Sequence, residues 1–470
     1  MWKKISEIAA DVNAGKVKAV DNVKDSLSVI KEKSEYKAII ATIEERALER
    51  AAQIDKIVSS GKNAGRLAGV PFIAKDNFLV FGADTTAASN ILKGFDAPYQ
   101  ATAIEKLEAE GAICVAKANL DAFAHGSSTE NSDYFTTLNP SDKTRVPGGS
   151  SGGSVAAVML DMTPFALGTD TGGSIRLPAS FCGAVGYKPT YGLVSRYGVV
   201  AMASSTDVIG PITKNVEDAA LILEVISGKD LLDGTTIDRD DKYDLEKTKL
   251  AGKKIGVVRE YMSDGVDDGV RGVIEEAIEK LRNQGAEIVD ISLASLPLAL
   301  AVYYIICPAE VSSNLGRYDG QRFGHSSTGA KNLEDSYAMS RAEGFGAEAK
   351  RRIMIGTYVL SSGYYEAYYK KAALVRTKLI NEFNDAFNKV DFLVGPTSPI
   401  TAFKVGEKID DPLKMYLIDI MTVAANLTGS PAISVPAGRS DGMPVGLQII
   451  APWGEDMSLL NIAAAITEEI

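Results

Sequence analysis

Residues 69–75 read GVPFIAK, a short apolar run that ends on a lysine. Two similar runs, AICVA at residues 112–116 and KIGVV at residues 254–258, also have the length and composition of buried strands. Each run follows or precedes a stretch with helical spacing. Alternation of strands and helices is typical of an α/β layer structure around a parallel or mixed sheet.

The segments on either side of these runs extend the pattern. Residues 5–58 place apolar side chains at helical intervals between charged ones, which predicts two or three amphipathic helices. Near the other end, DFLVGPT at residues 391–397 and PAISVP at residues 431–436 again indicate core strands that end in turn residues. Residues 229–249 are rich in Asp and Lys, and they predict a surface loop.

We therefore expect an α/β fold in a single large domain over residues 1–470, with a central mixed β-sheet covered by helices on both faces. Within it, we distinguish N-terminal helices (residues 1–60), a core that holds the glycine-rich motifs (65–225) and the remainder of the sheet (250–470).

The composition limits the classes of function. A chain of 470 residues with 46% hydrophobic content can bury a large core. The net charge of -11 argues against broad binding of a phosphate backbone, which needs a basic face. Cys114, Cys182 and Cys307 are widely spaced and form no CxxC, so we expect neither a disulfide framework nor a metal site. The N-terminus has no apolar signal core, and we expect a soluble, cytoplasmic protein.

A glycine- and serine-rich segment, VPGGSSGGS, occupies residues 146–154 and leads directly into the helix-like run VAAVML at residues 155–160. Composition alone would suggest a flexible linker. However, the segment is embedded in apolar sequence and opens a helix, where glycines let the backbone approach a ligand and leave amides free. We therefore interpret it as part of a site.

A second glycine-rich turn, GTDTGGSIRLPAS, follows at residues 168–180. The chain contains no GxxxxGK[ST] motif, so a phosphate cradle is poorly supported. The other interpretation is a serine nucleophile at Ser174. In that case, the preceding backbone amides of Thr171, Gly172 and Gly173 would form an oxyanion hole.

A serine nucleophile needs a base, and the chain has only two histidines, His125 and His325. The sequence identifies no partner for either histidine in a Ser-His-Asp triad. A lysine can serve as the base if burial lowers its pKa enough to leave a neutral amine. Lys75 ends the first apolar run and is our candidate. Cys182 is a rival nucleophile, but no histidine lies near it in sequence.

Taken together, GVPFIAKDN around Lys75, PGGSSGGS around Ser150 and GTDTGGSIRLPAS around Ser174 closely resemble the amidase signature family. By this resemblance, Ser174 is the nucleophile that forms an acyl-enzyme, and Lys75 is the ultimate base. Ser150, which the family holds with a cis peptide bond, relays the proton. The resemblance implies no metal or organic cofactor in this chain.

Segments outside these motifs, among them residues 123–132, 303–310 and 360–369, resemble the A subunits of glutamyl-tRNA(Gln)/aspartyl-tRNA(Asn) amidotransferases. This implies hydrolysis of glutamine to supply ammonia within a heterotrimer. The partner B and C subunits would then handle misacylated tRNA, and the partner would use ATP and Mg. Two alternatives remain: a stand-alone amidase that acts on another small carboxamide, and a non-catalytic scaffold that retains the motifs.

A bound glutamine needs a cation for its α-carboxylate and an anion for its α-ammonium, because an unpaired charge in a pocket is costly. By the resemblance, Arg352 and Asp419 take these roles, with Tyr303 as a neighbouring contact and Tyr304 as its rival. Without the resemblance, Arg352 would belong to a solvated basic cluster and Asp419 to the surface of a helix over residues 414–425.

The resemblance also places Gly126 and Ser127 in the wall of this pocket. His125 precedes them, at a position where the family usually has an apolar residue such as methionine. This departure bears on substrate selectivity rather than on the reaction.

Overall fold

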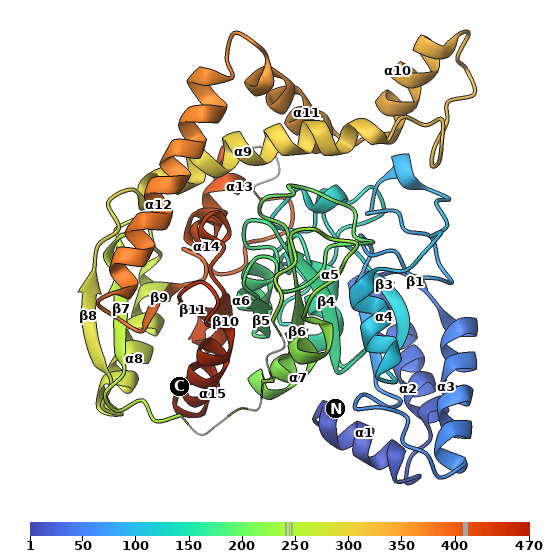
Figure 1. Ribbon diagram of the computed structural model, residues 1–470, viewed down its shortest axis with the longest axis horizontal. Coiled ribbons are helices and arrows are strands. Elements are labelled where there is room, and N and C mark those ends of the chain that lie inside the picture. The colour runs from blue at the N-terminus through green and yellow to red at the C-terminus, as the bar shows by residue number, and fades with distance from the viewer. Residues whose placement is uncertain (240–241, 244, 246–247, 408–411) are drawn as a thin grey trace.

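The computed structural model describes the chain except residues 240–241, 244, 246–247 and 408–411. The described residues form one 11-stranded sheet in the order β1-β3-β2-β4-β6-β5-β10-β11-β9-β7-β8. Neighbouring strands are parallel at some positions, such as β2 beside β3, and antiparallel at others, such as β4 beside β6. Helices cover both faces of this mixed sheet, which confirms the predicted fold class (Figure 1).

The sheet brings together segments from across the chain. Its strands are β1 (Ile39–Thr42), β2 (Pro71–Lys75), β3 (Ile113–Ala118), β4 (Phe165–Asp170), β5 (Val185–Lys188), β6 (Val208–Thr213), β7 (Lys254–Val258), β8 (Glu287–Ile291), β9 (Phe392–Pro396), β10 (Ala432–Ser440) and β11 (Met443–Ile450).

The α-helices of the described residues are α1 (Ile5–Asn13), α2 (Ala19–Glu32), α3 (Glu44–Ser59), α4 (Thr102–Ala109), α5 (Gly152–Met159), α6 (Arg176–Cys182), α7 (Val216–Ile226), α8 (Asp268–Asn283), α9 (Ala299–Asn314), α10 (Leu333–Gly344), α11 (Ala347–Leu360), α12 (Lys371–Phe387), α13 (Pro412–Leu417), α14 (Val423–Thr428) and α15 (Asp456–Glu469). In Figure 1, α9, α10 and α11 extend above the sheet, and α12 descends from them at the left of the view.

The apolar runs identified in the sequence form β2, β3, β7, β9 and β10, as predicted. The two or three amphipathic helices predicted at the N-terminus also form, as α1 to α3. The sequence analysis missed β1, a four-residue edge strand between α2 and α3 that pairs antiparallel with β3. So short a strand, flanked by helices, carries too little periodicity to be recognised.

The alternation of side chains along β2 positions the catalytic candidate. Phe72 and Ala74 belong to the core packed with α4 and α7, whereas Ile73 belongs to a second core packed with α2, α3 and α5. Since successive side chains of a strand point to opposite faces, Lys75 shares the face of Ile73. The strand therefore delivers its terminal lysine to the side where α5 begins.

Among the described residues, one helical stretch, Leu296–Arg317, is long and apolar enough to cross a membrane by length and composition alone. Half of it is buried inside the fold, and it includes Tyr303 and Tyr304 of the site described below. Core helices meet the same criterion, and this stretch contributes Val302 and Ile306 to the main core.

Candidate active site

Lys75 and Ser150 form the centre of the site. The Nζ atom of Lys75 lies 2.7 Å from Oγ of Ser150, and both side chains are fully buried. Two further oxygens surround the amine: Oγ of Ser151 at 3.0 Å and Oγ1 of Thr169 at 2.9 Å. The three hydroxyl oxygens fit the three tetrahedral positions that remain on the amine nitrogen once its own side chain takes the fourth, and the Thr169 carbonyl lies farther away at 3.5 Å.

The burial of Lys75 decides its protonation state. Loss of solvation lowers the pKa of Lys75 to about 7, although the carboxylates of Asp121, Asp170 and Asp207 act in the opposite direction. A neutral amine has two N–H groups and one lone pair. With Ser151 and Thr169 accepting the two N–H groups, the lone pair is left to face Ser150. The arrangement can take a proton from Ser150 near neutral pH.

The glycine- and serine-rich segment lies against residues 170–176, which carry the candidate nucleophile Ser174 and which we call the nucleophile turn. The Gly149–Ser150 peptide bond is cis, as the family resemblance implied. The next residue, Ser151, donates its backbone N–H to the carbonyl of Ser174 at 3.1 Å. Ser174 itself is largely buried, with 8% of its surface exposed. The structure thus brings the three predicted catalytic residues into one region, although they are far apart in sequence.

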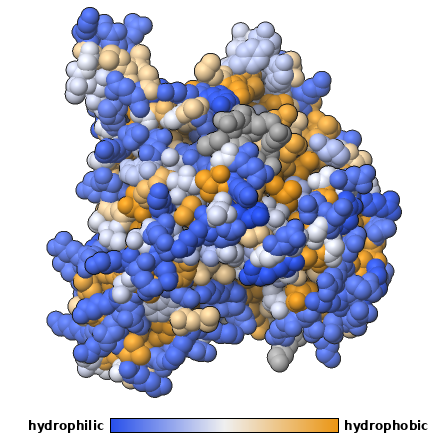
Figure 2. Space-filling model, turned by 180° about the vertical axis from the view of Figure 1, so that it is seen from behind, coloured by the Kyte–Doolittle hydropathy of each residue, from blue (hydrophilic) through white to orange (hydrophobic). Residues whose placement is uncertain are grey.

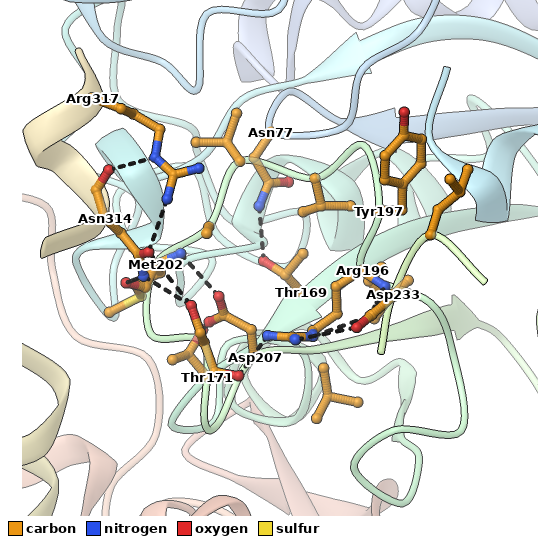
Figure 3. Close-up of a pocket in the computed structure, with 17 residues that line it drawn as sticks. Asn77, Thr169, Thr171, Arg196, Tyr197, Met202, Asp207, Asp233, Asn314 and Arg317 are labelled. Atoms are coloured by element: carbon orange, nitrogen blue, oxygen red, sulfur yellow. Dashed lines mark hydrogen bonds and ion pairs between the residues drawn. The ribbon is translucent and has the colours of Figure 1, made fainter. Parts of the chain in front are cut away.

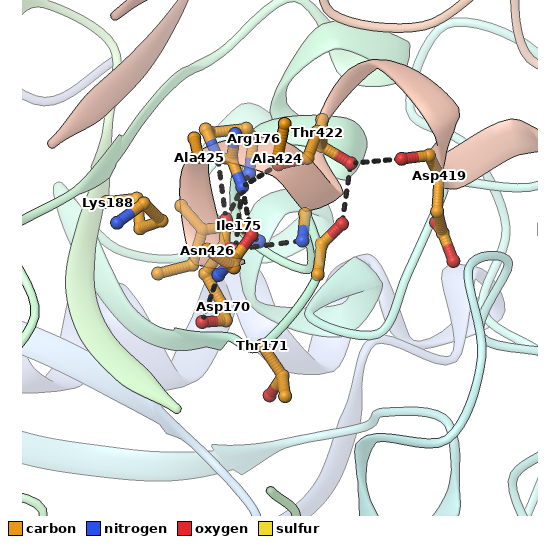
Figure 4. A network of polar contacts seen from close by, with 12 residues as sticks. Asp170, Thr171, Ile175, Arg176, Lys188, Asp419, Thr422, Ala424, Ala425 and Asn426 are labelled. Atoms are coloured by element: carbon orange, nitrogen blue, oxygen red, sulfur yellow. Dashed lines mark hydrogen bonds and ion pairs between the residues drawn. The ribbon is translucent and has the colours of Figure 1, made fainter. Parts of the chain in front are cut away.

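An ion pair fixes the turn that carries Ser174. Asp170 ends β4, and its carboxylate accepts hydrogen bonds from the backbone of Gly173 at 2.8 Å and of Ile175 at 3.2 Å. The Arg176 guanidinium holds the same carboxylate at 3.0 Å and keeps the pKa of Asp170 well below its usual range against the cost of burial. Figure 4 shows this network with Asn426, which also donates to Asp170.

The predicted oxyanion-hole residues occupy this turn. The Gly173 N–H is already engaged by Asp170, whereas Thr171 uses its hydroxyl to donate to Asp207 at 2.7 Å. Gly173 has φ +133°, and a Cβ there would lie 2.2 Å from Oγ1 of Thr422. At Gly172, a Cβ would lie 2.6 Å from the ring of Tyr303. Only glycine fits at both positions. Because Asp170 accepts the Gly173 N–H, the oxyanion hole that the sequence predicts is left with the amides of Thr171 and Gly172.

Asp419 is buried beside a small cleft, where it contacts two of the residues that line the cleft. Its carboxylate accepts hydrogen bonds from Oγ of Ser127 at 2.7 Å and from the hydroxyl of Tyr304 at 2.9 Å. Burial raises the pKa of Asp419 to about 6. Thr422, three residues on, donates to the carbonyl of Gly172 at 2.6 Å. The cleft has a volume of about 40 Å³, and its wall includes Gly126.

The predicted helix over residues 414–425 is wrong. The chain forms α13, a 3-10 turn at Ile418–Met421 and α14, so Asp419 lies in the break between two helices. It is 7% exposed rather than a surface residue. The break lets its carboxylate turn inward to Ser127, which a continuous helix on the surface would not allow.

The adjacent residues Tyr303 and Tyr304 of α9 contact different parts of the site. Tyr304 donates to Asp419, whereas Tyr303 packs against Gly172 of the nucleophile turn. Their rings are perpendicular, with centroids 5.1 Å apart. Tyr304 lines the cleft and Tyr303 lies against the turn, and the contact of either one with glutamine stays a prediction.

Arg352, on α11, is 3% exposed and belongs to the same cleft. Its Nε lies 2.9 Å from Oε1 of Glu348, one helical turn earlier, and its guanidinium lies over the rings of Tyr304 and Tyr416. The Tyr416 hydroxyl donates to the same oxygen of Glu348 at 2.9 Å. The basic cluster at residues 350–352 is therefore not uniformly solvated, because its third member is buried and paired.

The rival catalytic groups have no role in this geometry. His125 is fully buried, and neither ring nitrogen has a hydrogen-bond partner in the described structure. Burial lowers the pKa of His125 well below its ordinary value. His325 pairs with Glu343 at the surface. Burial also raises the pKa of the Cys182 thiol far above its usual range, which removes the thiolate a cysteine nucleophile needs.

A second polar cavity, of about 230 Å³, lies near Lys75 (Figure 3). Thr169 contributes to its wall, and Oγ1 of this residue accepts from both Lys75 and Asn77. Figure 3 shows Thr171 beside Asp207 in the same cavity. The described residues include no group of three or more His, Cys, Asp or Glu that could hold a metal ion.

Sequence reasoning missed several groups that shape the site. Ser151 and Thr169 contact the lysine, and both lie inside the quoted glycine-rich motifs, so their proximity to Ser150 and Asp170 was the available signal. Asp121 gave no such signal. Its buried carboxylate accepts the backbone N–H groups of Thr129 at 2.8 Å and of residue 131 at 3.0 Å, which braces the loop that carries Ser127.

Comparison with known proteins agrees with this geometry. A family model described as amidase matches residues 21–460. The chain is 51% identical over 467 residues to the A subunit of glutamyl-tRNA(Gln) amidotransferase from Thermoanaerobacter pseudethanolicus, covering 99% of this chain and 96% of that protein. It is 52% identical over 464 residues to the protein of the same name from Caldanaerobacter subterraneus subsp. tengcongensis, with 98% and 95% covered.

Solved structures give the same result. The crystal structure of the A subunit of glutamyl-tRNA(Gln) amidotransferase from Thermotoga maritima superimposes with a TM-score of 0.79 at 44% identity, over 95% of this chain and 91% of that one. Native peptide amidase from Stenotrophomonas maltophilia has a TM-score of 0.82 at 27% identity, over 99% and 96%. With a family model that spans most of its length, this chain belongs to the amidase family.

Proposed function

We propose that this chain is the glutaminase subunit of a tRNA-dependent amidotransferase, and that it hydrolyses glutamine through Ser174, Ser150 and Lys75. The observation that carries the proposal is the 2.7 Å contact between the buried Lys75 amine and the Ser150 hydroxyl. A lysine with a pKa of about 7 can act as a general base at physiological pH without a histidine.

The reaction proceeds by acyl transfer. Lys75 accepts a proton from Ser150 as Ser150 accepts one from Ser174, and Oγ of Ser174 attacks the carboxamide carbon. The Thr171 and Gly172 amides stabilise the negative charge on the carbonyl oxygen. The leaving nitrogen takes up a proton by the same route and departs as ammonia. Water then attacks the γ-glutamyl ester, which releases glutamate and restores the Ser174 hydroxyl.

The cleft beside the nucleophile turn suits an α-amino acid. Asp419 pairs with the α-ammonium group, and Arg352 pairs with the α-carboxylate, as each charge requires once it leaves water. Glu348 already neutralises Arg352 at 2.9 Å. The substrate carboxylate must therefore share this guanidinium with Glu348 or displace it. Ser127 and Tyr304 hold the Asp419 carboxylate toward the cleft.

The identity of the subunit is supported by near-full-length relatives at about 50% identity, which are named as A subunits of glutamyl-tRNA(Gln) amidotransferase. In this role, the chain works in the cytoplasm with B and C subunits. The partner subunits bind Glu-tRNA(Gln) or Asp-tRNA(Asn) and use ATP and Mg to activate the acceptor. The net charge of -11 fits a protein that leaves tRNA to its partners.

Ammonia release from L-glutamine tests this proposal. The purified chain is assayed alone and with the B and C subunits of its own organism and misacylated tRNA, with Ser174→Ala as the blank. Release that depends on Ser174 and rises with the partners supports the proposal. Strong release from unrelated carboxamides, with little from glutamine and no response to the partners, would instead identify a stand-alone amidase.

A further inference from the structure

An unusual concentration of apolar and aromatic side chains lies at the junction of α11 and α12. Eight of the 22 large hydrophobic side chains that are exposed in the described structure fall within residues 354–374. We call their exposed surface the tyrosine patch; its members include Met354 (72% exposed), Tyr358, Leu360, Tyr364, Tyr368 and Leu374. In Figure 2, the protrusion to the right of centre at the top is mostly pale, with orange side chains below it.

The rings of the patch are already arranged against one another. The Tyr358 ring lies 4.2 Å from that of Tyr364 and 6.0 Å from that of Tyr368. A second pair, Tyr365 and Tyr369, stacks at 5.4 Å. Because these contacts hold the side chains in place, a partner that covers them loses little conformational entropy on binding. Tyrosine and methionine are also enriched at the centres of protein interfaces.

The charge around the patch differs in sign from that of the whole chain. Residues 347–378 contain seven basic and two acidic residues, whereas the protein carries a net charge of -11. Lys350, Arg351, Lys370 and Lys371 are exposed at its margin. An apolar centre with a basic rim is complementary to a protein surface that has an apolar centre and acidic residues around it.

RNA is a poorer match for this surface. All three arginines of residues 347–378 are already engaged, since Arg351 and Arg352 pair with Glu348 and Arg376 donates to the Leu427 carbonyl at 2.7 Å. The aliphatic members, such as Met354 and Leu374, offer no planar face on which a base could stack.

The patch is connected to the substrate cleft through α11. The buried face of this helix carries Arg352 and Gly356, and a Cβ at Gly356 would lie 1.8 Å from the carbonyl oxygen of Pro308, so the helix is packed closely on α9. The opposite face carries Met354 and Tyr358. A protein bound to the outer face would therefore contact the same helix that holds the substrate carboxylate.

We infer that the tyrosine patch is the docking surface for the amidating partner of this chain, through an apolar partner face rimmed by acidic side chains. The inference rests on the proposed function, because it names the face through which the glutaminase meets its partner subunits. It predicts that binding of the partner affects the glutamine cleft, because α11 contributes to both the patch and the cleft.

The test measures binding of the full-length chain to the purified B and C subunits of the same organism by isothermal titration calorimetry. The patch variants are Tyr364→Ser with Tyr368→Ser, and Lys370→Glu with Lys371→Glu. Tyr337→Ser, on α10, and Lys62→Glu are matched controls because both residues are exposed outside the patch. Circular dichroism and partner-free hydrolysis of glutamine check that every variant is folded.

We expect both patch variants to weaken binding by at least about tenfold and both controls to bind like wild type. Equal binding by patch variants and wild type would overturn the inference. The inference would also be overturned if the wild type self-associates and the patch variants are monomeric. It would be overturned as well if the free chain binds tRNA and the variants lose this affinity while they still bind the B and C subunits. If wild type binds these subunits and releases ammonia, such results leave the proposed function standing; if wild type does neither, the proposed function fails as well.

Discussion

The Nζ atom of Lys75 and the Oγ atom of Ser150 lie 2.7 Å apart, and neither side chain reaches solvent. Strand β2 supplies the amine, and a glycine-rich loop 75 residues further along the chain supplies the hydroxyl. Because burial lowers the pKa of Lys75 to about 7, this pair can exchange a proton at the pH of the cell. In the proposed mechanism, the remaining features of the site position the substrate and Ser174 around this exchange.

The pH dependence of the reaction follows from this pKa. Protonated Lys75 has no lone pair to accept the Ser150 proton, so kcat for glutamine should fall about tenfold for each pH unit below about 7 and level off above it. Steady-state kinetics from pH 5.5 to 9 would test this. A kcat that is flat across pH 7, or a Lys75→Ala variant with full activity at neutral pH, would contradict the assignment of the base.

Ser150 and Ser151 form a matched pair, since both contact Lys75 but only Ser150 is assigned to the relay. Ser150→Ala should lower kcat by roughly 10²- to 10⁴-fold, because Ser174 then has no group to take its proton. Ser151→Ala removes an acceptor of the amine and should cost at least about tenfold less. Equal losses in the two variants would show that neither serine is a specific relay.

The candidate catalytic groups could be selected from the sequence because they lie in local motifs. Lys75 ends an apolar run, and Ser150 and Ser174 lie in glycine-rich turns. The residue types and their order along the chain are therefore sufficient to select these three candidates. The same locality let five strands be recognised.

The parts that could not be predicted depend on tertiary packing. Glu348 pairs with Arg352, and Asp121 braces the loop of Ser127, yet neither lies in a motif that marks it. The break at Ile418–Met421, which turns Asp419 inward, is also hidden, because residues 414–425 have helical spacing throughout. Strand β1 is set by pairing with β3 rather than by its own four residues.

The role assigned to Asp419 predicts a substrate-dependent defect. Asp419→Asn retains the size of the side chain but loses its charge, so it should raise KM for glutamine by roughly 10²-fold. Glutaramate keeps the carboxamide and the carboxylate but lacks the α-ammonium group, and it should be hydrolysed equally by wild type and variant. Parallel losses on both substrates would mean that Asp419 supports the fold of the cleft rather than the ammonium.

Replacement of the buried His125 should stabilise the folded protein. Its two ring nitrogens are buried without partners, so His125→Met should raise the free energy of unfolding by about 1 to 2 kcal/mol. Burial keeps the pKa of folded His125 well below the unfolded value near 6.5, so the unfolded chain binds more protons below that pH. Wild type should therefore lose stability as the pH falls below about 6.5.

Urea unfolding at pH 8 and pH 5.5 measures both effects. The His125→Met variant should be more stable at each pH and should lose less stability on acidification than wild type. A less stable variant would show that the imidazole makes a favourable contact in the folded protein.

The central claim is that Ser174 carries the γ-glutamyl group during turnover. Rapid acid quenching of the chain with L-glutamine, followed by peptide mapping by mass spectrometry, would locate that group directly. We predict a γ-glutamyl ester on the peptide that contains Ser174, and none in Ser174→Ala. A modified residue elsewhere, or ammonia release by wild type and Ser174→Ala at the same rate, would contradict the account.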